Sequence, residues 1–513
     1  MLLKGWIFSM NNNSMKYLKS GSDIRGIALE GVEGEKINLT NEVIEKICSA
    51  FVSWISEKNK IAIPAISIAV GHDSRISASR IKNVVINTLR GMGVSIYDCS
   101  LASTPAMYMA ISVLSCTASI QITASHHPFN RNGFKFFTSG GGVSERDIEE
   151  ILNLTDAEVR FSSEKYGNVR QINLMNYYCE NLRQVIKDGL KTNEETPLKG
   201  LKIVVDAGNG AGGFFATDVL KPLGANIDGS VFLNPDGSFP NHVPNPENSH
   251  AMKSIVEATT KSCADLGIIF DTDVDRAAFA DSDGHEISKN RFIALSSAIA
   301  LNGNSEGVIV TDSVTSDYLN TFIEKLGGIP FRYKRGYNNV ISMAKKINQK
   351  GVNCPLAIES SGHAAFKSNG FLDDGAFLAA KIVVELVKCK RKNGNLQDII
   401  KDLVDAKERV SMRIAANVEE EEIQNLFKDF KHFGNTNKFL ELDEKNVEGI
   451  RINFKGKRQK GWMLIRKSVH DPVIVLDAES YVPQGIKSMM NLIFPFFRKY
   501  KFLDMSEFHK SIK

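Results

Sequence analysis

Three segments of the chain repeat one plan: an apolar strand ends in a polar turn, a helix-length stretch follows, and then come a Gly-led strand and a third apolar strand. The Gly-led strands read GVSIYDC, GANIDGSV and GGIPFRYK. The third strands and the loops after them read ASIQITASHHP, ADLGIIFDTDVDR and CPLAIESSGHAAF. Continuous apolar strands that alternate with amphipathic helices are typical of parallel or mixed sheets covered by helices. The repeat predicts an α/β fold with three related domains and mixed sheets.

From about Lys407 the pattern changes. A helix is expected near Glu419 to Phe433, strands at VEGIRINF and GWMLIRKS, and a closing helix around Pro483 to Lys499. This region predicts a smaller α+β domain at the C-terminus. At the other end, MLLKGWIFSMNNNSMKYLKS has too short an apolar run for a signal or membrane segment. It is expected to be a loosely held leader, with Met10 and Met15 as alternative starts.

Charge and cysteine content narrow the class of protein. A net charge of +4 on 513 residues is small and indicates neither nucleic-acid nor membrane binding. The seven cysteines are odd in number, widely spaced and without a C-x-x-C pair, which argues against a disulfide framework and a structural zinc site. A reducing, cytoplasmic location is expected.

The loop TASHHPFNRNGFKFF begins where the third strand of the first unit ends, and ligands of open α/β sheets bind at such carboxyl ends. It places Ser125 before two histidines and upstream of Lys135. A serine hydroxyl is a weak nucleophile without help, and a phosphate on it needs cations and backbone donors. An isolated serine would more often be part of a polar turn, but this surrounding pattern favours a functional one.

The loop DTDVDR carries carboxylates at alternate positions, Asp271, Asp273 and Asp275. A tight loop can aim all three at one hard cation, and with a phosphate oxygen they suit Mg²⁺. An EF-hand is excluded, because that loop requires Gly where Arg276 stands and Glu where Ser282 stands. The alternative is an acidic surface turn.

Two further loops carry polar side chains in the third and fourth units. ESSGH supplies Glu359, Ser361 and His363, which can grip vicinal sugar hydroxyls and move a proton. RKSVHDP supplies Arg466, Ser468, His470 and backbone amides, a cradle for a phosphate dianion, although a polar turn between strands would look similar.

The run GNGAGG offers a rival interpretation. Gly208, Gly210 and Gly213 satisfy G-x-G-x-x-G after a strand, and Asp228 follows about twenty residues later, as in a dinucleotide-binding oxidoreductase. The other two units lack glycines at this position, so close packing of helix against strand is the favoured role.

Together these loops resemble the α-D-phosphohexomutase family, which includes phosphoglucomutases and phosphomannomutases, from about Ser20 to Glu479. SGSDIRG is similar to that family's opening motif, TASHHP to its phosphoserine loop, DTDVDR to its metal loop, YKRGYNN to its third-domain loop, ESSGH to its sugar-binding loop and RKSVHDP to its phosphate-binding loop. The resemblance implies four domains around a central cleft. In this chain a flexible leader at 1–19 comes first, and the four domains are a phosphoserine-loop domain at 20–190, a metal-binding domain at 191–292, a sugar-binding domain at 293–404 and a phosphate-binding domain at 405–513.

The resemblance also implies roles for single residues. The implied catalytic residues are Ser125, Lys334, His363, Lys135 and Arg25; the substrate-binding residues are Glu359, Ser361, Arg276, Arg466, Ser468 and His470; the metal ligands are Asp271, Asp273, Asp275 and the phosphate on Ser125. Lys334 and His363 would transfer protons. Phospho-Ser125 would give its phosphoryl group to a hexose monophosphate, and the resulting bisphosphate would turn over and return its other phosphoryl group. Mg²⁺ and a hexose 1,6-bisphosphate primer are the implied cofactors, and small hexose phosphates the partners.

The chain departs from the family pattern at two places. His127 stands where members commonly have Asn, and the phosphate loop carries Val469, His470 and Asp471 where Gly or Asn, Thr and Glu are usual. The altered phosphate loop leaves a second hypothesis open, in which the chain is a weakly active or inactive relative that binds sugar phosphates as a regulatory protein. Glucose, mannose and amino-sugar phosphates are all compatible with the ESSGH loop.

Overall fold

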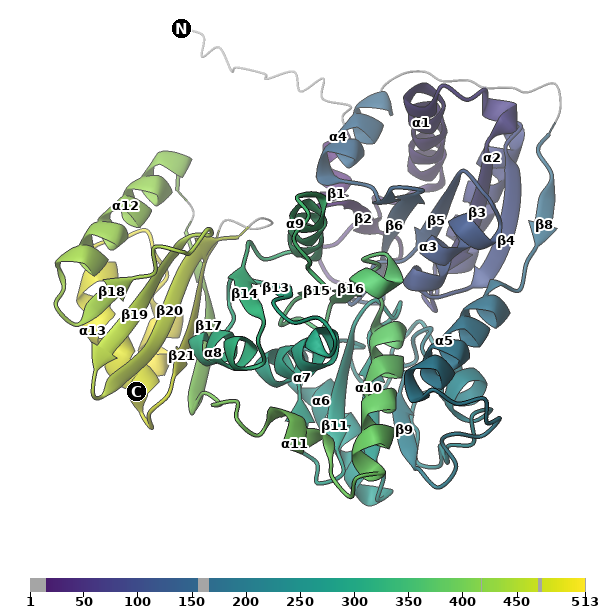
Figure 1. Ribbon diagram of the computed structural model, residues 1–513. Helices are drawn as coiled ribbons and strands as arrows, with labels where there is room; N and C mark the ends of the chain where they lie inside the picture. Colours follow the sequence, from purple (N-terminus) through teal and green to yellow (C-terminus); the bar gives the residue numbers. More distant parts are fainter. Residues whose placement is uncertain (1–14, 156–165, 417, 469–472, 513) are drawn as a thin grey trace, which may run out of the picture.

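The computed structural model describes residues 15–155, 166–416, 418–468 and 473–512 of the chain. The described residues form four sheets, one in each of four units that follow one another along the chain (Figure 1). The first three units have mixed sheets covered by helices, and the last unit has an antiparallel sheet with its own helices. The predicted α/β class with three related units and a smaller α+β unit is confirmed.

The first unit contains an eight-stranded mixed sheet in the order β1-β2-β6-β5-β3-β4-β8, with β7 paired to β6. The strands are β1 (Lys19–Ser20), β2 (Asp23–Ile27), β3 (Ser67–His72), β4 (Ser95–Leu101), β5 (Ala118–Ile122), β6 (Arg131–Thr138), β7 (Gly141–Gly142) and β8 (Val169–Gln171). The helices are α1 (Asn41–Asn59), α2 (Ala78–Gly91), α3 (Thr104–Val113), α4 (Glu145–Leu154) and α5 (Leu174–Leu190), with 3₁₀ turns at Met15–Leu18 and Ile63–Ala65.

Alternation along the central strand β3 explains how helices cover both faces of this sheet. Ile68 and Val70 pack into the apolar cluster that contains α1, α2 and α4, whereas Ala69 between them packs into the cluster that contains α3 and α5. β3 is parallel to both β4 and β5, and β6 returns antiparallel beside β5. Ser125 therefore lies on the connection that leaves the carboxyl end of β5.

The second unit contains the four-stranded sheet β12-β11-β10-β9. Its elements are β9 (Ile203–Asp206), a short π-helix at Phe215–Leu220, α6 (Ser249–Lys261), β10 (Leu266–Phe270), β11 (Ala277–Asp281) and β12 (Glu286–Ile287). β9 is parallel to β10, and β11 is antiparallel to β10, so the plan of the first unit recurs.

One predicted strand of the second unit is wrong. The GANIDGSV segment forms only isolated bridges, Lys202 with Asn226 and Asp206 with Val231. Side chains within the segment satisfy its backbone locally instead: the Asn226 side chain accepts from the amide of Asp228, and the Ser230 hydroxyl donates to the carbonyl of Ile227. These local hydrogen bonds compete with a continuous ladder.

The third unit contains the sheet β14-β13-β15-β16. Its elements are α7 (Lys289–Leu301), β13 (Val308–Thr311), α8 (Asp317–Lys325), β14 (Ile329–Arg332), α9 (Tyr337–Gln349), β15 (Leu356–Ile358), β16 (Ala364–Phe366), a 3₁₀ turn at Lys367–Asn369, α10 (Gly375–Lys390) and α11 (Leu396–Ile400). β13 is parallel to β14 and β15, and β16 is antiparallel to β15. The order and directions of these four strands repeat those of β4-β3-β5-β6 in the first unit.

The fourth unit contains the antiparallel sheet β17-β21-β20-β19-β18. Its elements are β17 (Glu408–Ala415), α12 (Glu420–Thr436), β18 (Leu440–Leu442), β19 (Ile450–Gly456), β20 (Gln459–Lys467), β21 (Val473–Ser480), α13 (Gly485–Phe497) and α14 (Ser506–Ile512). The apolar residues between its sheet and helices form a separate core, whereas one cluster runs through the first three units.

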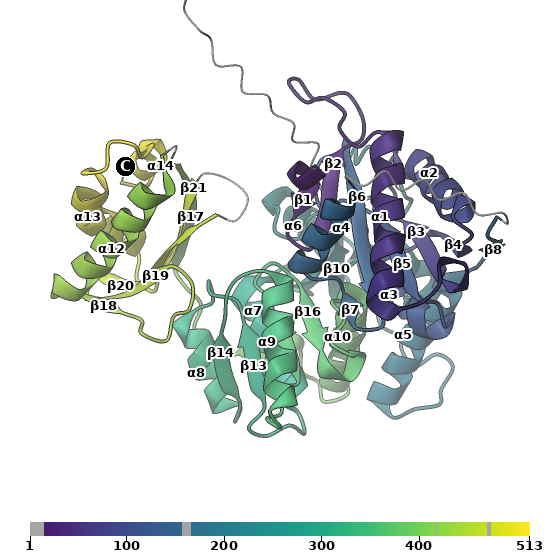
Figure 2. The same cartoon turned by 90° about the horizontal axis from the view of Figure 1, so that it is seen from above.

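The fourth unit lies beside the third in both views (Figures 1 and 2). Buried Arg451 on β19 joins them, because its guanidinium donates to the carbonyls of Ser313 at 3.0 Å and Thr315 at 2.9 Å. The same guanidinium stacks on Trp462 of its own unit, 3.8 Å from the ring centroid. Polar contacts of this kind join two units without merging their cores.

The expected leader is partly wrong, because its last residues are folded. Met15–Leu18 forms a 3₁₀ turn, Lys19–Ser20 forms β1, and the side chains of Met15 and Leu18 are buried in the core of the first unit. The rest of that expected leader lies outside the described residues.

Two further findings concern helices and thiols. Among the helices of the described ranges, none is long and apolar enough to cross a membrane. The seven cysteines are free thiols, and five of them are buried.

Candidate active site

The four units share one cavity of about 1180 Å³. Polar residues from every unit line it, among them Arg25, Ser125 and Lys135 of the first unit, Asp275 and Arg276 of the second, Arg335, Glu359, Ser361 and His363 of the third, and Arg413, Arg466 and Ser468 of the fourth. The loops after β5, β10 and β15 all reach this cavity, as expected for the carboxyl ends of strands in α/β sheets.

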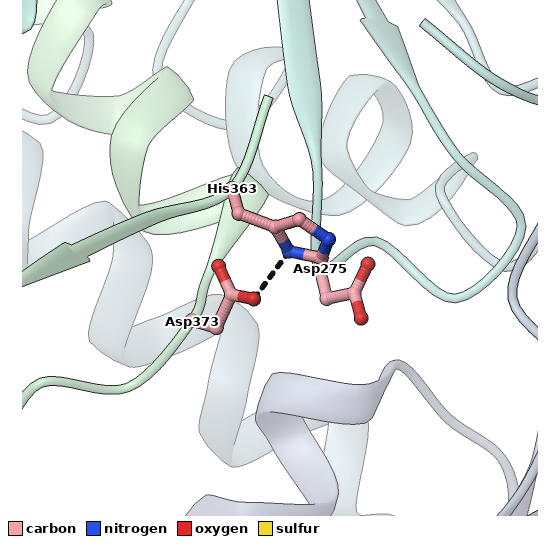
Figure 3. Close-up of side chains that lie close together, drawn as sticks. All are labelled: Asp275, His363 and Asp373. Carbon is pink, nitrogen blue, oxygen red and sulfur yellow. Dashed lines mark ion pairs between the residues drawn. The ribbon is translucent and has the colours of Figure 1, made fainter. Parts of the chain in front are cut away.

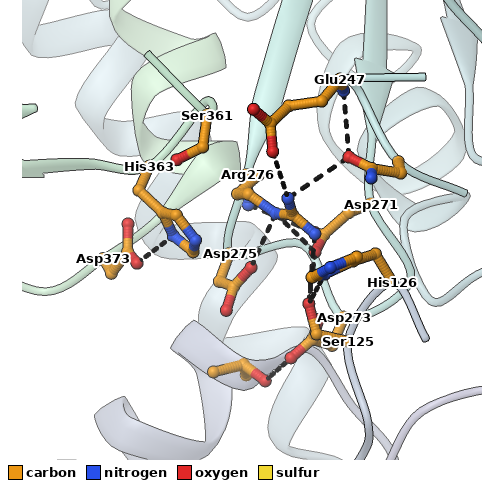
Figure 4. A network of polar contacts seen from close by, with 12 residues as sticks. Ser125, His126, Glu247, Asp271, Asp273, Asp275, Arg276, Ser361, His363 and Asp373 are labelled. Atoms are coloured by element: carbon orange, nitrogen blue, oxygen red, sulfur yellow. Dashed lines mark hydrogen bonds and ion pairs between the residues drawn. The ribbon is translucent and has the colours of Figure 1, made fainter. Parts of the chain in front are cut away.

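Ser125 lies on the cavity wall and is 3% exposed. Its backbone takes a left-handed conformation, φ 49°, and its amide donates to the Thr123 hydroxyl at 2.8 Å. The Ser125 hydroxyl donates to the Asp271 carboxylate at 3.0 Å and lies 3.3 Å from the guanidinium of Arg276 (Figure 4). The predicted nucleophile and the predicted metal loop thus meet, although they come from different units.

Arg75 holds the loop that carries Ser125, and the sequence alone did not single it out. Its buried guanidinium donates to the carbonyl oxygens of Ser125, His127, Pro128 and Arg131. Its own amide is fixed by the Asp73 carboxylate at 3.0 Å. The planar guanidinium of Arg75 therefore donates hydrogen bonds to several backbone carbonyls of the turn at once. An ammonium group cannot reproduce this geometry.

Replacing Arg75 with Lys is expected to lower the free energy of unfolding by about 2–4 kcal/mol, since buried carbonyls lose their donors. Because the Ser125 loop then loosens, kcat should fall by about tenfold or more. Denaturant unfolding and an activity assay measure the two effects.

Arg80→Lys is the matched control, because Arg80 on α2 also donates to backbone carbonyls, but to those of Ala28 and Leu39 and not to those of the Ser125 loop. It should leave kcat unchanged. An Arg75→Lys protein with wild-type kcat would show that Arg75 does not position the loop.

The metal loop brings three buried carboxylates together. Asp271 and Asp273 are 0% exposed and Asp275 is 1% exposed, and one ligand oxygen from each lies within 4.8 Å of the others. Between them Val274 takes φ 68°, a strained conformation for a β-branched residue. One oxygen of Asp273 and one of Asp275 make no hydrogen bond to any described residue. A site of this composition fits a hard divalent cation such as Mg²⁺.

Lys135 and Arg276 supply positive charge beside these carboxylates. The Lys135 ammonium lies 3.2 Å from Asp273 and contacts Asp275, and Arg276 lies 3.1 Å from Asp271. Burial alone lowers the pKa of Lys135, but Asp273 and Asp275 outweigh it and raise the pKa well above its ordinary value. Both cations are therefore charged where a phosphate would meet the metal loop.

Two more residues of the first unit face the same end of the cavity. Arg25 lines the cavity and is held by Asp23 at 2.8 Å. His126, which the sequence did not single out, places its Nδ1 3.3 Å from the Ser125 hydroxyl. Burial and the charge of Arg276 hold the pKa of His126 far below its usual range, so it is a neutral hydrogen-bonding partner.

The ESSGH loop brings His363 against Asp275 and Asp373 (Figure 3). His363 Nδ1 pairs with the Asp373 carboxylate. Burial alone lowers the pKa of His363, but Asp373 and Asp275 outweigh it and raise the pKa to about 9. His363 thus carries a proton at neutral pH. Asp373 is a partner that the sequence did not reveal, because it lies ten residues later on the chain.

Glu359 and Ser361 of the same loop line the cavity together with His363. The Ser361 hydroxyl donates to Glu359 at 3.3 Å, and the amide of Gly336 donates to the same carboxylate. Burial and the nearby charge of Asp312 raise the pKa of Glu359 to about 7. These side chains offer both donors and acceptors to sugar hydroxyls.

The expectation for Lys334 is not supported by its position. Lys334 is exposed and is not among the residues that line the cavity, whereas the next residue, Arg335, is. Arg335 pairs with Glu247 at 3.1 Å, and its amide donates to Glu448 of the fourth unit at 3.1 Å. In this turn the side chains of neighbouring residues point in different directions, which a motif alone cannot resolve.

Arg466 and Ser468 lie at the part of the cavity formed by the fourth unit. The Ser468 hydroxyl accepts from Arg413 on β17 at 3.4 Å. His470, predicted from the same loop, lies outside the described residues.

The glycine run has the packing role that the sequence favours. A Cβ at Gly210 would lie 2.7 Å from the Thr272 carbonyl oxygen, and one at Gly213 would lie 2.2 Å from that of Leu233. The Ala211 amide donates to the Thr272 carbonyl at 2.8 Å. Backbone thus fills the space that a dinucleotide would need, and the run supports the metal loop.

The chain matches three domain models in order. Residues 17–160 match phosphoglucomutase/phosphomannomutase alpha/beta/alpha domain I, residues 176–284 match domain II, and residues 289–406 match domain III. The chain is 29% identical over 417 residues to a phosphomannomutase/phosphoglucomutase of Pseudomonas syringae pv. tomato, covering 81% of this chain and 83% of that protein. It is 28% identical over 471 residues to a phosphoglucomutase of Neisseria gonorrhoeae, covering 91% and 94%.

A solved structure is also similar. The phosphoglucomutase/phosphomannomutase family protein of Burkholderia thailandensis superposes with a TM-score of 0.76 at 26% identity, over 94% of this chain and 97% of that one.

Proposed function

This chain belongs to the phosphoglucomutase/phosphomannomutase family, and from that membership we propose that it is an isomerase that interconverts hexose 1-phosphate and hexose 6-phosphate. We infer that Ser125 carries the phosphoryl group and that a hexose 1,6-bisphosphate is the intermediate. One observation carries the proposal: the Ser125 hydroxyl lies 3.0 Å from Asp271 of the carboxylate cluster, on the wall of a cavity that all four units line.

The charged residues at and beside the metal loop support this chemistry. Asp271, Asp273 and Asp275 would hold Mg²⁺, which when bound would neutralise oxygens of the transferring phosphoryl group. Lys135 and Arg276 add fixed positive charge at the same place. Phosphoryl transfer depends mainly on such positioning and charge stabilisation.

We assign proton transfer to the third unit. In the first half-reaction the sugar hydroxyl oxygen bonds to phosphorus as the bond from phosphorus to Ser125 Oγ breaks, and the hydroxyl proton must be received. His363 holds a proton at neutral pH, and Glu359, with its pKa near 7, is partly ionised. The ionised form of Glu359 can receive the hydroxyl proton in one half-reaction and return it in the other, whereas His363, already protonated, can donate a proton but cannot accept one.

The bisphosphate must then reverse its orientation so that its other phosphoryl group reaches Ser125. A cavity of about 1180 Å³ gives a hexose bisphosphate room to do so. A bisphosphate primer would restore the phosphoserine form whenever the intermediate escapes. The free thiols of the described chain suit the reducing cytoplasm, where we place the enzyme.

A coupled assay tests the proposed function. Protein whose Ser125 phosphorylation has been measured by intact mass should interconvert glucose or mannose phosphates when Mg²⁺ is present. Unphosphorylated protein should do so only after a hexose 1,6-bisphosphate primer is added. Intact protein that binds these hexose phosphates but turns over none of the glucose, mannose or amino-sugar series, primer included, would contradict it.

A further inference from the structure

We propose that Glu247 is a positioning residue, which holds the Arg276 guanidinium in place beside Ser125 and links it to Arg335 of the third unit. This inference rests on the proposed function and adds a residue from a segment that no motif of the sequence singled out. Glu247, Arg276 and Arg335 all line the shared cavity. Figure 4 shows Arg276 between Glu247 and Ser125.

Each nitrogen of the Arg276 guanidinium faces a different group. Nε donates to the Asp271 carboxylate at 3.1 Å, and Nη2 lies 3.3 Å from the Ser125 hydroxyl. Nη1 donates to the Asn245 side chain at 3.3 Å and lies 3.8 Å from the Glu247 carboxylate. Because the group is planar, the partners of Nη1 fix the direction in which Nη2 points. Asn245 and Glu247 therefore set the orientation of Arg276 toward Ser125.

Asn245 and Glu247 form a closed group of contacts around this nitrogen. The Asn245 side-chain oxygen accepts from the Glu247 amide at 2.9 Å as well as from Arg276. The two carboxylate oxygens of Glu247 have separate partners, since Oε1 accepts from Arg335 at 3.1 Å and Oε2 faces Arg276. One carboxylate thus lies between a guanidinium of the second unit and one of the third, and its negative charge offsets their mutual repulsion.

The segment that carries these two residues is anchored at both ends. Before it, the buried His242 imidazole lies 3.0 Å from the Asp206 carboxylate. Pro244 packs where Gly208 leaves room, because a Cβ on Gly208 would lie 2.9 Å from the Cβ of Pro244. After it, the Asn248 side chain accepts from two amides in the first turn of α6. A segment fixed in this way can hold a side chain with the precision that catalysis requires.

The carboxylates of the metal loop attract Arg276 from the other side. Asp271 lies 3.1 Å and Asp275 3.8 Å from its Nε. Without the charge of Glu247, the guanidinium would be drawn toward these two carboxylates, and Nη2 would no longer be held toward Ser125. A displacement of about 1 Å can cost about 100-fold in rate.

The contribution of Glu247 to folding stability is expected to be small. Its side chain is 37% exposed and that of Arg335 is 27% exposed. Ion pairs with this much exposure add little to the free energy of unfolding. Loss of the Glu247 charge should therefore affect catalysis much more than it affects Tm.

The test follows phosphoryl transfer to Ser125 directly. Glu247→Gln should slow the phosphorylation of Ser125 by glucose 1,6-bisphosphate about tenfold, measured by intact mass against time. In the coupled assay kcat should fall by a similar factor, with KM changed by less than about threefold. Glu247→Asp keeps the charge and should recover part of the loss. Glu257→Gln is the matched control, because Glu257 on α6 pairs with Lys261 at 2.9 Å outside the cavity lining, and it should leave both rates unchanged.

A double-mutant cycle shows whether Glu247 acts through Arg276. Arg276→Lys alone should slow phosphorylation, because the planar group is lost. Adding Glu247→Gln to that variant should slow it by less than about twofold more, since residues that act through one contact are not additive. The same tenfold loss in both backgrounds would show that Glu247 acts independently of Arg276 and would overturn the inference.

The remaining outcomes separate this inference from the proposed function. If Glu247→Gln phosphorylates Ser125 at the wild-type rate, or raises KM at unchanged kcat, the inference about Glu247 is overturned and the proposed function stands. A Tm lowered as far as by Arg75→Lys would show a structural role instead and would also overturn it. If the wild-type protein takes up no phosphate on Ser125 and turns over no hexose phosphate, the proposed function fails and takes this inference with it.

Discussion

Ser125→Ala is expected to lower kcat by about 10⁴-fold or more, with loss of the covalent phosphate from the protein. The hydroxyl is the group that would carry the phosphoryl group between sugars, and among the described residues no other serine hydroxyl hydrogen-bonds to the metal loop. Alanine at a position 3% exposed removes only one oxygen, so the fold should persist. A coupled assay and intact mass measure the two outcomes.

Hexose phosphate binding is the control within that variant. It should stay near the wild-type value because the arginines of the fourth unit are untouched. Ser342→Ala, on the helix α9 that also borders the cavity, is the matched variant and should keep full activity. Turnover by Ser125→Ala above one per cent of wild type would show that the phosphoryl group travels by another route.

Asp271→Asn is expected to lower kcat by about 10³-fold, because charge stabilisation by a bound metal is worth several kcal/mol. The same change should not destabilise the metal-free protein. Three carboxylates within 4.8 Å and at most 1% exposed repel one another, and a neutral amide of the same shape relieves that repulsion. The metal-free Tm should therefore stay equal or rise, whereas Mg²⁺ should raise the Tm of the wild type only.

The exposed turn at Asp283 provides the control. It belongs to a second acidic cluster, Asp281, Asp283 and His285, whose latter two members are exposed. Asp283→Asn should leave kcat and the Mg²⁺ effect on Tm unchanged. Equal thermal stabilisation of the wild type and Asp271→Asn by Mg²⁺ would place the metal elsewhere.

Motifs at strand ends were the most predictable part of the site. The position of Ser125 after one apolar strand and of the three aspartates after another follows from chain order, and α/β sheets bring such ends to one edge. Lys334 was less predictable, because which of two adjacent side chains points into a cavity depends on the conformation of the turn. The strand predicted at GANIDGSV was also wrong because of local conformation. Hydrogen bonds within the segment outcompete strand pairing.

The amino-acid pattern alone predicted the three repeated units, the smaller last unit and the loops that carry Ser125, the aspartates and His363. It did so because hydrophobic periodicity and polar loop residues are local properties of the chain. Folded coordinates were needed to show that Arg75 donates to the Ser125 loop, that Asp373 pairs with His363, and that Arg413 lies across Val475 from Arg466. Those contacts join residues distant in the sequence through packing and strand register, which periodicity does not encode.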